Sequence, residues 1–135
     1  MKVRLRNNMP LLLNWADEDS ASIIFSLVGE ISVKDYGEAL GTLQQMSQER
    51  QNVALIIHYS SDYIVNMNGF AESAKHFYQF MHNLNVWQVL VATKSADIII
   101  LWTSTLDLYK IEPPTYCFAN TIEEAIEQIA AKRAD

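Results

Sequence analysis

VALIIHYSSDYIVNMNGFAESAKHFYQFM, residues 53–81, is the stretch that decides the fold, because a strand, a loop and a helix follow one another within it. Residues 53–57 form a continuous apolar run of strand length, which is typical of a central strand covered on its faces. A polar loop over residues 60–69 comes next. Apolar side chains then recur on one helical face, at Phe70, Ala74, Phe77, Tyr78 and Met81. A buried strand that leads through a loop into an amphipathic helix is the unit of an α/β fold.

Two apolar runs precede this unit, over residues 11–15 and 22–28, and the polar residues 16–20 separate them. Such a polar cluster is typical of a turn between antiparallel strands, so we expect a leading β-hairpin. The first six residues alternate basic and apolar side chains, as an exposed edge strand does. A helical pattern after the hairpin predicts a helix from Val33 to about Glu49.

Four further elements are expected on the carboxyl side. Residues 86–92 form an apolar run that predicts a strand. Residues 95–106 contain three consecutive isoleucines, which favour a strand. Their apolar residues nevertheless recur three or four positions apart, and the segment begins with a serine that can cap a helix. We therefore expect a helix. Pro113-Pro114 ends that segment, because proline has no N–H to donate. Residues 116–119 then predict a short strand, and Asn120 starts a terminal helix.

The resulting order is two strands, then alternating helices and strands, then a last helix. This alternation predicts one α/β domain over residues 1–135, with a mixed, mostly parallel β-sheet, an N-terminal hairpin and about four helices. Half of the residues are hydrophobic, which is enough to bury a core without disulfides or metal.

Charge and composition exclude several classes of function. The net charge of −6 argues against nucleic acid as a partner, since phosphate backbones need a basic face. The single cysteine, Cys117, cannot form an intrachain disulfide, which fits a reducing compartment. Because no apolar run approaches the ~20 residues of a membrane span and no secretory leader pattern is seen, we expect a cytoplasmic protein.

The residue types that usually carry catalysis or bind metals do not form a motif. His76 and His82 lie six residues apart on one predicted helix and point to different faces, whereas a zinc pair needs a spacing of four. An enzyme would need His58 or His76 to meet a carboxylate in a pocket, and the candidates are Asp62 and Glu72. The four glycines are scattered, so there is no phosphate-binding loop. We expect no catalytic residue, no metal site and no cofactor.

Three segments share a pattern with one known family. Leu27-Val28-Gly29-Glu30-Ile31-Ser32 is similar to a strand that ends in Gly-Glu-Leu-Asp before a helix. Residues 53–70 are similar to a central strand and loop that lead to an Asp-Ser-Ser-Gly-Leu helix start, and residues 115–129 to a last strand and terminal helix. Over residues 23–129 the chain thus resembles the STAS domains of bacterial anti-sigma factor antagonists, the SpoIIAA-like proteins. The resemblance implies a STAS-like fold.

The chain departs from this family at the phosphorylation motif. In the family's signalling members, a partner kinase that is also an anti-sigma factor phosphorylates the second serine of Asp-Ser-Ser-Gly. The corresponding residues here are Asn66, Met67, Asn68 and Gly69, so that only the glycine is kept. Asn68 has no hydroxyl to accept a phosphoryl group. Instead, we expect Asn68 to cap the helix by accepting a hydrogen bond from an amide two or three residues further on.

The resemblance implies a non-enzymatic regulatory domain that binds a protein partner through the loop and the helix after it, without phosphorylation at the usual position. An anti-sigma factor or a serine-kinase-like protein is the implied class of partner. The expected partner-binding residues are Ser60, Ser61, Asp62, Asn66, Met67, Asn68 and Gly69. Hydroxyl groups that could still accept phosphate in this region are those of Ser60, Ser61 and Ser73.

Other functions stay open at this point. A SpoIIAA-like carrier of a small apolar ligand or lipid is the alternative, and it would need a cavity lined by large apolar side chains such as Phe77, Met81, Trp102 and Tyr109. A close-packed core would count against a carrier. A homodimer is compatible with either function.

Overall fold

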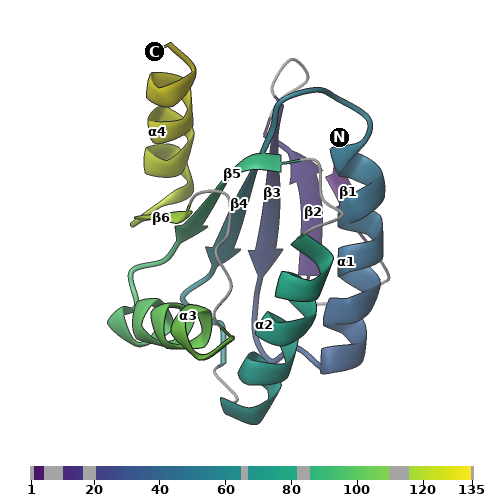
Figure 1. The fold of residues 1–135 in the computed structure, drawn as a ribbon, viewed down its shortest axis with the longest axis vertical. Coiled ribbons are helices and arrows are strands. Elements are labelled where there is room, and N and C mark those ends of the chain that lie inside the picture. The colour runs from purple at the N-terminus through teal and green to yellow at the C-terminus, as the bar shows by residue number, and fades with distance from the viewer. Residues whose placement is uncertain are drawn as a thin grey trace.

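The structure is a computed structural model that describes residues 2–4, 11–16, 21–64, 67–81, 86–109 and 116–134. Strands and helices alternate from the third strand onward, which confirms the predicted α/β fold (Figure 1). The elements in chain order are β1 (Lys2–Arg4), β2 (Leu11–Trp15), β3 (Ser22–Leu27), α1 (Val33–Ser47), β4 (Val53–Tyr59), α2 (Met67–Met81), β5 (Val86–Ala92), α3 (Ala96–Tyr109), β6 (Tyr116–Ala119) and α4 (Ile122–Ala134).

The described strands form one mixed sheet in the order β1-β2-β3-β4-β5-β6. β1 pairs with β2, and β2 with β3, in antiparallel register, with Leu13 opposite Phe25 in the hairpin. The pairs β3-β4, β4-β5 and β5-β6 are parallel. The predicted hairpin and the mostly parallel sheet are therefore confirmed, and β1 lies at the sheet edge as expected.

The helices cover the two faces of the sheet unequally. Because neighbouring parallel strands follow one another in sequence, right-handed crossovers place the connecting helices α1, α2 and α3 on the same face. α4 follows the last strand and packs on the opposite face. Along β4, Leu55 and Ile57 point into the larger core beneath α1–α3, whereas Ala54 and Ile56 point into the core beneath α4. Burial on both faces explains why this strand is apolar throughout.

α4 is fixed at the edge of the sheet where the parallel strands begin. A guanidinium N–H of Arg133 donates to the carbonyl oxygens of Ala21 at 3.1 Å and Asn52 at 3.0 Å. Lys132 Nζ donates to Oε1 of the buried Gln88 at 2.7 Å. These bonds hold the last turn of α4, so the first turn of the helix is held at the opposite edge, where the parallel strands end.

α2 begins earlier than predicted. Its first residue is Met67, so Asn68 is the second residue of the helix, and the prediction that Asn68 caps it is wrong. An N-cap residue precedes the first helical residue and has an extended backbone, whereas Asn68 follows Met67 within the helix. Asn66 lies outside the described residues, as do the predicted turn at residues 17–20, the Pro113-Pro114 pair and His82.

The helix expected at residues 95–106 is confirmed as α3, which extends to Tyr109. Ser95 Oγ accepts a hydrogen bond from the Ile98 amide at 3.3 Å and so caps the helix. Ile98 and Trp102 are buried on one face, while Ile100 is 60% exposed. Helical spacing of the buried positions therefore outweighs the strand propensity of the three isoleucines.

Candidate functional site

The loops after β3 and β4 are bonded to each other at the carboxyl edge of the sheet. The Gly29 amide donates to the Asp62 carbonyl oxygen at 3.1 Å, and the Ile64 amide donates to the Gly29 carbonyl oxygen at 2.8 Å. Gly29 has a φ of +71°, which a residue with a side chain rarely adopts. One glycine therefore holds the second loop through both its N–H and its C=O.

Within this loop, Ser60 forms a tight turn. Its carbonyl oxygen accepts from the Tyr63 amide at 3.0 Å, and its Oγ accepts from the Asp62 amide at 3.1 Å. Ser61 and Asp62 at the tip of the turn are exposed, and Ile64 is 56% exposed. The loop is thus held by hydrogen bonds within the turn and to Gly29, while Ser61, Asp62 and much of the Ile64 side chain are exposed.

The structure describes the side-chain surroundings of only some of the predicted partner-binding residues. The structure brings Ser60, Ser61 and Asp62 together in the turn and places Gly69 in the first turn of α2. Met67 and Asn68 belong to the same helical turn, although their side chains lie outside the described part of the chain, and Asn66 is not described. We call residues 60–64 together with Gly69, Ala71 and Glu72 the loop face.

A shallow acidic groove adjoins the loop face between the first turns of α1 and α2. Three carboxylate side chains line it, those of Glu30, Asp35 and Glu72, and none of the described residues in its lining is basic. Gly69 forms part of the wall. This side of the loop face therefore has a negative potential, which attracts a basic partner.

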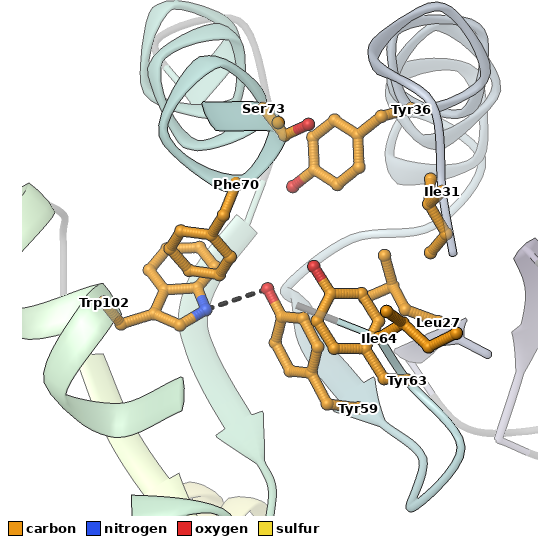
Figure 2. A pocket seen from close by; sticks show the side chains of 10 residues that line it. Leu27, Ile31, Tyr36, Tyr59, Tyr63, Ile64, Phe70, Ser73 and Trp102 are labelled. Carbon is orange, nitrogen blue, oxygen red and sulfur yellow. Dashed lines mark hydrogen bonds between the residues drawn. The ribbon is translucent and has the colours of Figure 1, made fainter. Parts of the chain in front are cut away.

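A cluster of aromatic rings lies beneath the start of α2. The Trp102 ring meets Phe70 and Phe77 edge-on, with ring centroids 6.1 Å and 5.6 Å apart, and Trp102 Nε1 donates to Tyr59 Oη at 2.9 Å. Figure 2 shows the hydroxyls of Tyr59, Tyr63, Tyr36 and Ser73 directed toward one small space. The space measures about 20 Å³, enough for about one water molecule.

A larger cleft lies outside the carboxyl ends of β4, β5 and β6. It measures about 710 Å³, and its polar lining comes from His58, Ser60, Ser61, Thr93, Lys94, Ser95, Asn120, Thr121 and Glu123. Burial lowers the pKa of His58 from its usual 6.5, and the negative charge of Glu123 partly opposes this shift. Burial therefore favours the neutral imidazole.

The structure does not assemble the acid–base pairs that the sequence suggested. The carboxylate whose charge acts on His58 is that of Glu123, rather than Asp62 or Glu72. His76 is exposed on α2, beside α1 residues such as Lys34, and does not line the His58 cleft. Sequence reasoning named His58, Ser60 and Ser61 for other roles, but it missed Glu123, Lys94 and Thr93, which also line the cleft. Their available signal was their position directly after predicted parallel strands, whose carboxyl ends share one edge.

Comparisons with known proteins do not assign the chain. Neither a scan against protein-family models nor a search of the curated proteins finds a match. Among the described residues, no three histidine, cysteine or acidic side chains are grouped so that they could hold a metal ion. The described helices include none that is long and apolar enough to cross a membrane.

Proposed function

We propose that the chain is a non-enzymatic, STAS-like regulatory domain that binds a protein partner through its loop face, without phosphorylation at Asn68. The observation that carries the proposal is the loop held by Gly29, which leaves Ile64 56% exposed. Ile64 lines the small cavity together with Ile31 and Gly69, and these two residues also line the acidic groove. A rigid loop loses little conformational entropy when a partner docks, and an apolar anchor beside charged residues is a common centre of an interface. The α/β architecture supports the same function, because it agrees with the STAS-like pattern in the sequence.

The charge of the groove indicates which partner surface would fit. Glu30 and Glu72 are exposed carboxylates on the groove wall, and Asp62 is exposed on the adjacent turn. We therefore expect a partner with a basic patch around an apolar pocket for Ile64, and an anti-sigma factor or serine-kinase-like protein is the class that the family resemblance implies. Such binding weakens with salt, as the Debye length falls from about 10 Å at 0.1 M to about 3 Å at 1 M.

Two exposed isoleucines allow a matched test. The full-length chain is immobilised, captured partners are identified by mass spectrometry, and their affinities are measured with purified proteins by calorimetry. Ile64→Asp should weaken partner binding by about tenfold or more, because Ile64 is the apolar anchor of the loop face. Ile100→Asp changes an isoleucine of similar exposure, 60% against 56%, on α3 and should leave the affinity unchanged. Equal binding by wild type and Ile64→Asp would refute the proposed interface.

Phosphorylation is tested separately by incubating the chain with ATP and the serine kinase of an anti-sigma system, followed by intact-mass measurement and peptide mapping. We expect no phosphate on residues 60–69. Asn68 has no hydroxyl, and the Ser60 hydroxyl already accepts the Asp62 amide within the turn. Stoichiometric phosphate on Ser61 would show that the loop keeps a covalent switch.

The aromatic cluster does not favour the alternative, a carrier of an apolar ligand. Phe77 and Trp102 are fully buried in ring contacts, and the cavity at Trp102 holds about 20 Å³. An acyl chain needs a pocket many times larger, since ligand pockets span roughly 300–1,000 Å³. The side chains of Met81 and Tyr109 are outside the described part of the chain. We place the proposed regulatory domain in the cytoplasm, and a homodimer is compatible with it.

A further inference from the structure

The small cavity beneath the start of α2 lies directly beside the acidic groove. Ile31 and Gly69 line both the cavity and the groove. Ile64 and Ser73, which also line the cavity, are themselves partly exposed. A partner segment that docks in the groove can therefore reach the cavity with one of its side chains.

Hydroxyl oxygens from four parts of the chain converge on this cavity. They belong to Tyr36 of α1, Tyr59 of β4, Tyr63 of the loop and Ser73 of α2 (Figure 2). The Tyr59 oxygen already accepts from Trp102 Nε1 at 2.9 Å. The hydroxyls of Tyr63 and Ser73 bond to no described residue. The lone pairs of these two oxygens are thus available to a donor that enters the cavity.

Aromatic rings form much of the remaining wall. Tyr59 and Tyr63 meet edge-on with ring centroids 4.7 Å apart, and the centroids of Tyr59 and Phe70 are 6.4 Å apart. The faces of such rings attract cations, because their quadrupole is negative there. None of the described residues that line the cavity is basic. Hydroxyl acceptors among aromatic rings therefore suit a cation with N–H donors.

The charges beside the cavity also favour a cation. The groove carries the carboxylates of Glu30, Asp35 and Glu72 between the starts of α1 and α2. Each helix start contributes a positive potential equivalent to about half an elementary charge. Three carboxylates outweigh these two contributions, so the potential at the entrance stays negative.

The volume of the cavity selects among the basic side chains. About 20 Å³ holds one group of the size of a water molecule. The ammonium of lysine is compact and has three N–H donors, whereas the guanidinium of arginine is a larger, planar fork with five. The four-carbon stem of a lysine packs along apolar side chains, and Ile31 and Ile64 offer such a surface at the cavity.

We propose that this cavity binds one lysine side chain of the protein partner. The lysine stem packs along Ile31 and Ile64, and its ammonium donates to the hydroxyl oxygens of Tyr63 and Ser73. These acceptors and the ring faces replace the water that the ammonium loses. The inference rests on the proposed function, because it names the residue that the partner inserts beside the loop face. It also makes the site specific for lysine over arginine.

The first test is an NMR titration of the full-length chain with tetralysine and with tetraarginine, two peptides of equal charge, each up to about 10 mM. The indole N–H of Trp102 is the reporter, because it donates to Tyr59 Oη at the cavity wall. We expect both peptides to shift the amides of Glu30 and Glu72, and only tetralysine to shift the indole signal saturably. An indole signal that tetralysine does not move, or that both peptides move equally, would overturn the proposal.

Matched variants locate the ammonium. Tyr63→Phe removes one acceptor and should weaken tetralysine binding about tenfold, the loss expected for one hydrogen bond to a charged group. Ser73→Ala removes the other acceptor and should act in the same direction. Ser61→Ala removes an exposed hydroxyl that does not line the cavity and should leave the affinity unchanged. Wild-type affinity in both Tyr63→Phe and Ser73→Ala would show that the ammonium does not bind here. The spectrum of each variant reports on whether it is folded.

The captured partner separates this inference from the proposed function. The lysine site predicts that Tyr63→Phe and Ile64→Asp both weaken the binding of the partner. If Ile64→Asp weakens binding and Tyr63→Phe does not, the loop face is the interface and the lysine site is wrong. If Ile64→Asp binds as tightly as wild type, the proposed function itself is refuted.

Discussion

Alanine in place of Gly29 should destabilise the protein and loosen the loop face. Gly29 has a φ of +71°, and a Cβ added there meets no atom within 4 Å, so the cost is conformational rather than steric. Holding alanine in the left-handed region costs about 1–2 kcal/mol. If the backbone relaxes instead, it turns away the N–H that bonds to Asp62 and the C=O that bonds to Ile64, each worth about 0.5–1.5 kcal/mol. The first route costs about 1–2 kcal/mol and the second about 1–3 kcal/mol. Because the protein takes the less costly route, we expect a loss of about 1–2 kcal/mol.

Gly37 provides the control for the same substitution. It lies exposed within α1, has no positive φ, and a Cβ added there also meets nothing within 4 Å. Gly37→Ala should therefore stabilise the protein by about 0.5–1 kcal/mol through helix propensity. Urea denaturation followed by circular dichroism measures both free energies of unfolding. Gly29→Ala with wild-type stability, or a loss at Gly37 equal to that at Gly29, would refute the role assigned to the Gly29 backbone.

Two further predictions concern the residues around the sites. Tyr59→Phe removes the acceptor of the buried Trp102 N–H and should lower the free energy of unfolding, measured by urea denaturation, by about 1–3 kcal/mol. The loss is nearer the lower value if a water molecule enters the adjacent cavity and accepts from the indole. The control, Tyr63→Phe, should cost under about 0.5 kcal/mol, because no described residue bonds to the Tyr63 hydroxyl. Burial lowers the pKa of His58 in the folded state, so the unfolded state binds more protons as the pH falls below 6.5. The stability that His58 contributes is present above pH 6.5 and is lost as the pH falls toward the folded pKa. The urea midpoint should therefore fall more between neutral and mildly acidic pH for wild type than for His58→Gln. An equal fall of the midpoint in the two proteins would contradict the lowered pKa of His58.

The sequence allowed most of the fold to be predicted, because long periodic segments determine their own secondary structure. The strand at residues 116–119 and the hairpin came from local pattern alone, and α3 followed from the spacing of Ile98 and Trp102 despite its isoleucines. The start of α2 was missed for a local reason. Asn66 and Asn68 are equally good capping residue types, and Asn68-Gly69 is also a common turn signal, so composition could not decide which asparagine precedes the helix.

The cleft could not be predicted, because the tertiary fold alone brings its residues together. His58 and Glu123 are 65 positions apart in sequence (123 − 58), and no spacing rule connects them. The decisive fact is that α3 and α4 cover opposite faces, which depends on where α4 packs after β6. Small side chains beneath α4, at Ala54, Ala92 and Ala119, were the available signal for that packing, since they allow a helix to approach the sheet closely.

The groove beside the loop face and the cleft at the ends of β4, β5 and β6 share a sheet edge but differ in the side chains that line them. The groove beside the loop face carries carboxylates at Glu30, Asp35 and Glu72 and would repel a phosphate. The cleft on the other side of the Ser60 turn is lined by Lys94 and by Glu123, which belongs to the first turn of α4. A basic protein surface therefore fits the groove, where the described charged residues are all carboxylates. Ile64 does not line the cleft, so Ile64→Asp tests the loop face and leaves the cleft intact.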